Sequence, residues 1–146
     1  MLSAKPGNRS NRNMDFQLAR VLLVDDDPTS RLTLQTVLEA GGYRVDSAAS
    51  AAEAFGKLEE QQYELVLSDL QMESPEAGLQ VLAHARMMDY KPATAIVTAS
   101  TNHPQETRSP SRMLVKPENL PELLAKVANM ISQRAARKVE REMRHN

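Results

Sequence analysis

The sequence predicts an α/β fold built on a parallel sheet, and three observations predict it. Five short apolar runs recur along the 146 residues. Amphipathic stretches with helical spacing lie between them, and helix-capping residues mark the junctions. Strands that alternate with helices are joined by right-handed crossovers, so the helices should cover both faces of a doubly wound, five-stranded sheet.

The first strand and helix have clear boundaries. Residues 21–24 are wholly apolar and stop at three aspartates, as expected for a strand buried on both faces. Asp27 is a good N-cap and Pro28 suits the first helical position. The helix that follows should end at Gly41 and Gly42.

The same alternation continues to the end of the chain. Ser50 and Glu53 have the spacing of a capping box, and a third helix is expected over 79–86. Asn119, with Glu122 three residues on, should cap the last helix. The strands are expected at 21–24, 43–48, 63–68, 93–98 and 113–115.

Two helices should be unusual. Pro104 and Pro110 bracket a polar stretch, so a fourth helix there should be short or distorted. By contrast, Ala135, Val139 and Met143 prolong the apolar stripe of the last helix through charged surroundings. This extended C-terminal helix has three interpretations that stay open: a frayed tail, a surface that pairs with a second copy, or a linker into an output domain.

Charge is distributed unevenly along the chain. The formal net charge of −1 divides into +3 for residues 1–20, −7 for 21–132 and +3 for 133–146. An acidic centre between basic ends suits a core that binds a cation better than one that wraps nucleic acid. The chain has no Cys, no apolar run long enough for a bilayer and no secretory signal, so a cytoplasmic location is expected.

Polar residues at the ends of four strands carry the functional prediction. They are Asp25 with Asp26, then Asp69, Thr98 and Lys116. Each alone has an ordinary explanation as a cap, a turn residue or a solvated charge. Together they gather at one edge of the sheet, beyond the carboxyl ends of parallel strands, where function collects in such folds.

These residue types suit phosphoryl transfer. Three neighbouring carboxylates would repel one another unless a cation lay among them, and Mg²⁺ is the one that prefers few carboxylates and several waters. The hydroxyl of Thr98 and the ammonium of Lys116 could then hold a phosphoryl group. A carboxylate can itself accept that group as an aspartyl phosphate.

The chain resembles the receiver domain of two-component response regulators. The resemblance rests on four motifs in the family's order, which cover about residues 19–132: VLLVDDDP at 21–28, LVLSDLQM at 65–72, IVTAS at 96–100 and VKP at 115–117. It implies a flavodoxin-like sheet of order 2-1-3-4-5. It also implies a phosphohistidine donor, on a sensor histidine kinase or a histidine phosphotransfer protein.

The resemblance also implies a role for each site residue. Asp69 is the phosphoacceptor, Asp26 binds Mg²⁺ directly and Asp25 acts mainly through water. The backbone carbonyl of Gln71 completes the ligands. Thr98 is the switch hydroxyl and Lys116 pairs with the phosphate. Such a protein is a signalling phosphoacceptor, with only self-catalysed phosphotransfer and autodephosphorylation, rather than an enzyme with an external substrate.

Three departures from the family pattern concern the output. Met113 stands where the family usually has an aromatic residue. The interval 99–115, with two prolines, is short for a full helix and two loops. The loop 73–78 has an apparent one-residue insertion and no proline directly after Met72.

One enzyme is an alternative. Residues 25–29 also fit the Asp-x-Asp-x-Thr motif of haloacid-dehalogenase-like phosphohydrolases, with Asp25 as nucleophile and Asp27 as acid/base. That assignment leaves Asp69 without a role. The predicted organisation is therefore a disordered N-terminal tail at 1–18, a receiver domain at 19–132 and a basic helical extension or linker at 133–146.

Overall fold

The computed structural model describes residues 19–69, 72–74, 76–98, 112–115 and 120–144, and gives only the backbone of residues 98, 112–115 and 120. Five strands are present in this part of the chain: β1 (Arg20–Val24), β2 (Arg44–Ala48), β3 (Leu65–Asp69), β4 (Ala93–Thr98) and β5 (Arg112–Val115). Four helices accompany them: α2 (Pro28–Ala40), α3 (Ala51–Glu60), α4 (Ala77–Arg86) and α5 (Leu120–Arg144).

All described strand pairs are parallel, and the sheet has the order β2-β1-β3-β4-β5. The first strand, β1, lies between β2 and β3, with Val24 level with Ala48 on one side and Ser68 on the other. The prediction of an α/β fold with a parallel sheet is confirmed. The predicted fourth helix falls in 99–111 and the predicted tail in 1–18, both outside the described residues.

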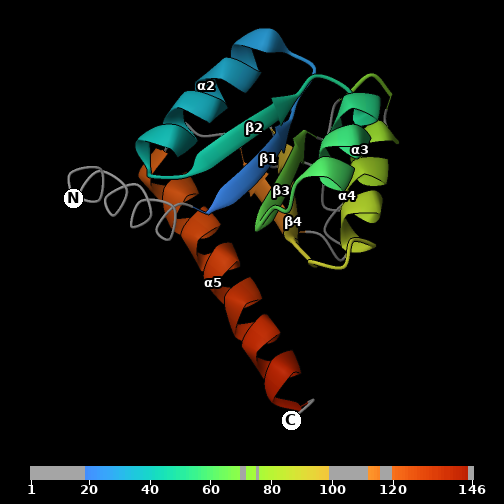
Figure 1. The fold of residues 1–146 in the computed structure, drawn as a ribbon. Coiled ribbons are helices and arrows are strands. Elements are labelled where there is room, and N and C mark those ends of the chain that lie inside the picture. The colour runs from blue at the N-terminus through green and yellow to red at the C-terminus, as the bar shows by residue number, and fades with distance from the viewer. Residues whose placement is uncertain (1–18, 70–71, 75, 99–111, 116–119, 145–146) are drawn as a thin grey trace, which may run out of the picture.

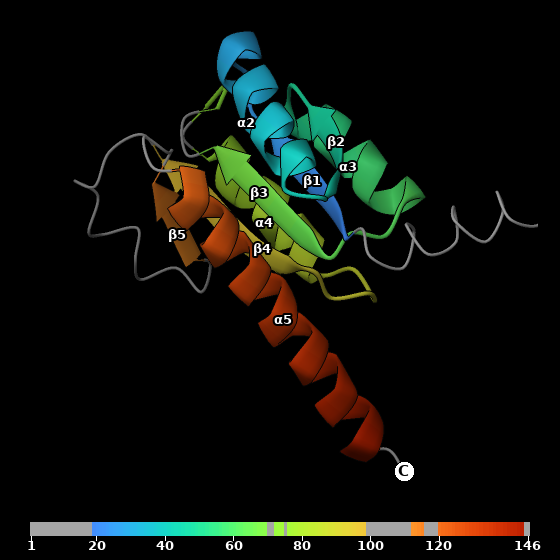
Figure 2. The same ribbon diagram turned by 90° about the vertical axis from the view of Figure 1, so that its left-hand side faces the viewer.

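Helices cover both faces of the sheet, as Figures 1 and 2 show. Alternate residues of β1 point to opposite faces: Val21 and Leu23 join one apolar core, Leu22 and Val24 the other. The first core is closed by α2 and α5, and the second by α3 and α4. Burial on both faces explains why these strands are continuous apolar runs.

The helix boundaries follow from local chemistry. Asp27 caps α2 by accepting a hydrogen bond from the Ser30 backbone N–H at 2.9 Å, and Gly42 leaves the helix with a φ of +102°. Ser50 likewise accepts from the Glu53 N–H. The predicted capping box differs in one detail, because the Glu53 carboxylate accepts from the N–H of residue 49, not of Ser50.

The last helix is the longest described element. It runs for 25 residues, or roughly 37 Å at 1.5 Å per residue. Its first half packs on the sheet through Leu123, Val127 and Met130, and its C-terminal end projects from the body (Figure 2). Val139 is 52% exposed and Met143 69% exposed. The predicted helical continuation is confirmed, while the predicted Asn119 cap lies outside the described residues.

Candidate metal centre at the carboxyl edge of the sheet

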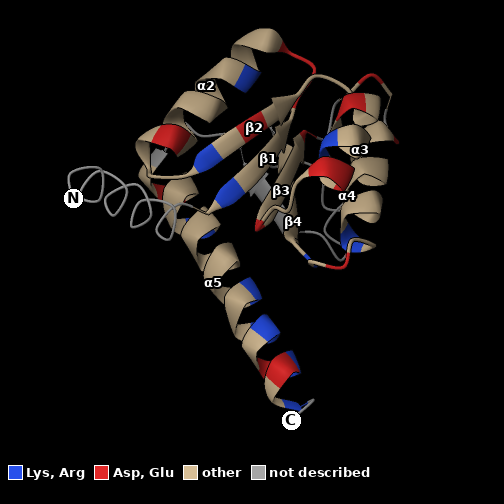
Figure 3. Ribbon diagram, viewed as in Figure 1, with Lys and Arg blue, Asp and Glu red and all other residues tan. Residues whose placement is uncertain are grey.

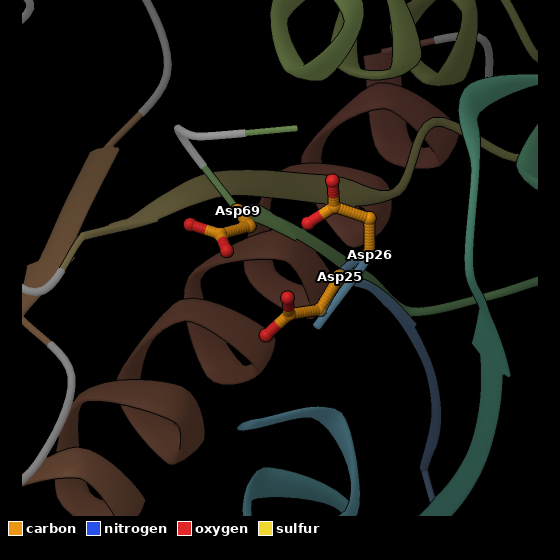
Figure 4. Close-up of side chains that lie close together, drawn as sticks. All are labelled: Asp25, Asp26 and Asp69. Atoms are coloured by element: carbon orange, nitrogen blue, oxygen red, sulfur yellow. The ribbon is translucent and has the colours of Figure 1, made fainter. Parts of the chain in front are cut away.

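Three carboxylates meet where β1 and β3 end. Asp25 and Asp26 follow β1, and Asp69 is the last residue of β3. Because the two strands are parallel neighbours, with Val24 opposite Ser68, their ends place these side chains together. One carboxylate oxygen from each residue lies within 4.8 Å of the others (Figure 4).

The backbone fixes Asp25 firmly. Its N–H donates to the Ala48 carbonyl at 3.0 Å, and its own carbonyl accepts from the Arg31 guanidinium at 2.7 Å. Its Oδ1 accepts a hydrogen bond from the Asp27 N–H at 2.9 Å. Aspartate side chains readily form this local turn with the backbone two residues on. Asp25 is thereby tied to β2 and α2 as well as to its own strand.

Burial differs among the three acids. Asp25 and Asp69 are 1% and 7% exposed, whereas Asp26 is exposed. Two buried carboxylates beside a third repel each other strongly in a medium of low dielectric constant, so a cation among them would be favourable. An all-oxygen donor set open on one side fits Mg²⁺, which keeps several of its waters.

Sequence reasoning missed two residues that shape this edge of the sheet. Gly78 lies in the first turn of α4, where an added Cβ would be 2.5 Å from the carbonyl oxygen of Asp69. Glu73 lies in the β3–α4 loop, and its carboxylate accepts from the Ala51 N–H at the start of α3 at 3.1 Å. Their long-range partners depend on the packing of α3 and α4, which periodicity does not describe. The available signal was a glycine directly before the helix predicted over 79–86.

Other predicted site residues are only partly placed. Gln71 and Lys116 lie outside the described residues. The backbone of Thr98 ends β4, one residue beyond Val97, which is level with Asp69. The backbone of Met113 lies opposite Ile96 in β5.

The one histidine of the described residues does not belong to the cluster of three aspartates. His84, on α4, stacks on Phe55 with ring centroids 4.8 Å apart. Its Nε2 lies 2.9 Å from a carboxylate oxygen of Glu59.

Comparison with known families identifies this arrangement. The family model "Response regulator receiver domain" matches residues 21–128. The chain belongs to this family. The matched range contains all three acids of the cluster, the helices α2, α3 and α4, and the start of α5. The comparisons give no support to the dehalogenase-like alternative.

Individual regulatory proteins are similar to this chain over different lengths. The gliding motility regulatory protein of Myxococcus xanthus is 36% identical over 61% of this chain, and the transcriptional regulatory protein GlrR of Escherichia coli is 30% identical over 88%. This chain spans only 12% and 30% of those two proteins.

A solved response regulator provides the structural comparison. Response regulator protein TrrA of Thermotoga maritima, solved in complex with Mg(2+)-BeF, superposes with a TM-score of 0.69 at 30% identity. The match covers 77% of this chain and 99% of TrrA. The fold is therefore flavodoxin-like with a parallel sheet. Among the described residues, no helix combines the length and apolar character that a bilayer span requires.

Proposed function

We propose that Asp69 is the phosphoacceptor of this receiver domain and that a phosphohistidine is the donor. The observation that carries the proposal is the meeting of the Asp69 carboxylate with those of Asp25 and Asp26, within 4.8 Å, at the carboxyl edge of the sheet. Asp69 is the last residue of the central strand β3 and pairs with Val97 of β4, while the residue before it, Ser68, also pairs with Val24 of β1. A fixed carboxylate loses little freedom when a phosphoryl group approaches it.

The three acids would hold Mg²⁺ together with the backbone carbonyl of Gln71. Asp26 is the exposed member and suits a direct ligand, while buried Asp25 suits contact through water. When bound, the ion neutralises the carboxylates and the charge on the transferring phosphoryl oxygens. Family membership and the oxygen-only donor set support this assignment.

The transfer itself needs few protein groups. A carboxylate oxygen of Asp69 forms a bond to phosphorus as the phosphorus–nitrogen bond to the donor imidazole breaks, so the imidazole leaves with the electron pair. Thr98 would hydrogen-bond a phosphoryl oxygen and Lys116 would pair with its charge. Hydrolysis by water returns Asp69 to its free form, so the chain turns over only its own phosphoryl group.

The partners follow from the same proposal. Receiver domains act with histidine kinases and output domains, so we assign residues 19–132 to the receiver and 133–146 to a helical extension. The extension would either pair with a second copy or lead into an output domain. Its projection from the body, with Val139 and Met143 exposed, supports both uses.

Labelling with radioactive acetyl phosphate in the presence of Mg²⁺ tests the assignment. Asp69→Asn should abolish labelling because the attacking oxygen is lost. Asp27→Asn is the matched control: it removes an adjacent charge, keeps a good N-cap for α2 and should label normally. Labelling that persists in Asp69→Asn but disappears in Asp25→Asn would contradict the proposal.

A further inference from the structure

A pocket of about 250 Å³ lies at the other end of the sheet from the acidic cluster. It is formed where α4, the start of β4 and the second half of α5 meet, with Arg86, Thr94 and Arg137 each contributed by a different one of these elements. Asp69 is level with Val97, three residues after Thr94, so roughly 10 Å of strand separates the two sites.

The lining of this pocket is polar and positive. Two guanidinium groups, the hydroxyl of Thr94 and the amide of Gln133 surround it, with Met130 and Ala93 as buried apolar neighbours. None of its lining residues in the described part of the chain is acidic. Arginine presents its N–H donors in a planar fork that matches anionic oxygens.

Contacts around the pocket hold its donors in place. Arg86 Nη1 lies 3.4 Å from Thr94 Oγ1. On α5, the guanidinium of Arg134 donates to the carbonyl oxygens of Tyr90 at 2.6 Å and Lys91 at 3.0 Å. This contact fixes α5 against the turn that precedes β4. Gln133 precedes Arg134 and Arg137 follows it by one turn, so the contact of Arg134 holds the backbone of both residues beside the pocket.

The pKa of Arg134 is affected by the positive charges around it. Burial lowers its pKa, Glu64 opposes that effect, and the positive charges of Arg141 and Arg137 lower the pKa further. Arginines on one side of α5 therefore repel one another. An anion beside Arg137 would reduce that repulsion.

We propose that the pocket between α4, β4 and α5 binds a small phosphate-bearing anion. A tetrahedral phosphate offers oxygens in several directions and can bind donors from three separate elements, whereas a planar carboxylate has only two oxygens. The bound anion would connect the body of the domain to the base of the helical extension through Arg86 and Arg137.

The test is a titration of the full chain, followed by amide chemical shifts, with a chelator present so that no divalent metal links phosphate to the acidic cluster. The probes are inorganic phosphate, glycerol 3-phosphate and succinate at constant ionic strength. Saturable shifts at Thr94 and Gln133 with either phosphate support the proposal, and the tighter of the two distinguishes the free ion from its ester.

Variants make the test specific. Arg137→Gln and Arg86→Gln should each weaken phosphate binding about tenfold, because each removes a charged donor. Lys138→Gln is the matched control, since Lys138 is the next exposed cation on α5 and does not line the pocket. The Lys138→Gln variant should bind phosphate with the affinity of the parent chain. Arg137 is exposed, so that variant should fold even where Arg86→Gln does not.

Three results would overturn the proposal. The first is an absence of saturable shifts with both phosphates. The second is equal weakening by Lys138→Gln and Arg137→Gln, which would show only a general effect of positive charge. The third is succinate binding as tightly as phosphate, which would remove the assignment to phosphate chemistry.

Discussion

Three consecutive aspartates at the end of β1 have three different environments. Asp25 is buried and bonded to its surroundings, Asp26 is exposed beside Asp69, and Asp27 caps α2. The direction in which each side chain leaves the backbone decides its environment, because the chain turns from strand to helix within these residues. One residue type in a run thus occupies a buried, an exposed and a helix-capping position.

Asp26→Ala should weaken Mg²⁺ binding by about tenfold or more, because it removes one of few carboxylate ligands. The residue is exposed, so the fold should be unaffected. Calorimetric titration of the metal measures the change. Asp27→Asn, which removes an adjacent charge outside the cluster, should bind with nearly the parent affinity. Equal binding by Asp26→Ala and the parent chain would refute the assignment.

Gly78→Ala should destabilise the domain by about 1–3 kcal/mol. The added Cβ would meet the backbone carbonyl of Asp69 at 2.5 Å and the Ser68 Oγ at 3.2 Å, and backbone cannot move aside cheaply. Urea unfolding measures the loss. Gly56→Ala is the control, because its added methyl group would have no neighbouring atom within 4 Å and α3 should gain about 0.5–1 kcal/mol. Similar effects of the two substitutions would contradict this explanation.

At the scale of elements, side chains far apart in sequence join helices to loops. Glu73 connects the β3–α4 loop to the start of α3, where its negative charge also meets the positive end of the helix dipole. Arg134 connects α5 to the turn before β4, 43 residues away in sequence from Lys91. These contacts orient elements whose internal structure is already set by capping and periodicity.

Arg134→Ala should lower the free energy of unfolding by about 1–2 kcal/mol, because two charge-assisted hydrogen bonds to backbone carbonyls are lost. Chemical denaturation measures this. Lys138→Ala, one turn further along α5 and exposed, should change stability by less than about 0.5 kcal/mol. Equal losses of stability in both variants would show that the hydrogen bonds of Arg134 to Tyr90 and Lys91 do not stabilise the fold specifically.

At the scale of the whole molecule, the body and the extension differ in the sign of their net charge. Residues 21–132 carry −7, and the extension at 133–146 carries +3. The basic residues of α5 other than Lys126 lie at 134–144, and Figure 3 shows basic residues along the part that projects. Helix α5 is therefore most basic where it leaves the sheet, and the near-neutral total of −1 combines this +3 with the −7 of residues 21–132 and the +3 of residues 1–20.

Stability of the whole fold should fall as pH rises above 10. Burial, followed by the hydrogen bond to Asp46, raises the pKa of Tyr63 well above its usual 10.0, and burial raises the pKa of Tyr90 to about 12. The folded protein then keeps protons that the unfolded chain releases, so stability is full below pH 10 and is lost between about 10 and 12.

Urea titrations from pH 8 to pH 12 measure this dependence. A chain with both Tyr63→Phe and Tyr90→Phe should show a flatter loss across that window, although its stability at pH 8 is lower because the hydroxyl bonds to Asp46 and the Leu58 carbonyl are absent. An unchanged slope would mean that other groups cause the alkaline loss.

Local patterns in the chain were enough to predict the α/β class, the apolar strands, the caps at Asp27 and Ser50 and the continuation of the last helix. These features depend on periodicity and capping, which are properties of short segments. The meeting of Asp25, Asp26 and Asp69 was predictable as well, because parallel strands bring their carboxyl ends to one edge.

Packing in three dimensions was needed for the close approach of Gly78 to Asp69, the bond from Glu73 to α3 and the contact of Arg134 with the turn before β4. The same packing brings Arg86 and Arg137 to one pocket. Each of these contacts depends on the distance between elements packed on the sheet. That distance is set by the summed shapes of buried side chains, and no local sequence pattern encodes it.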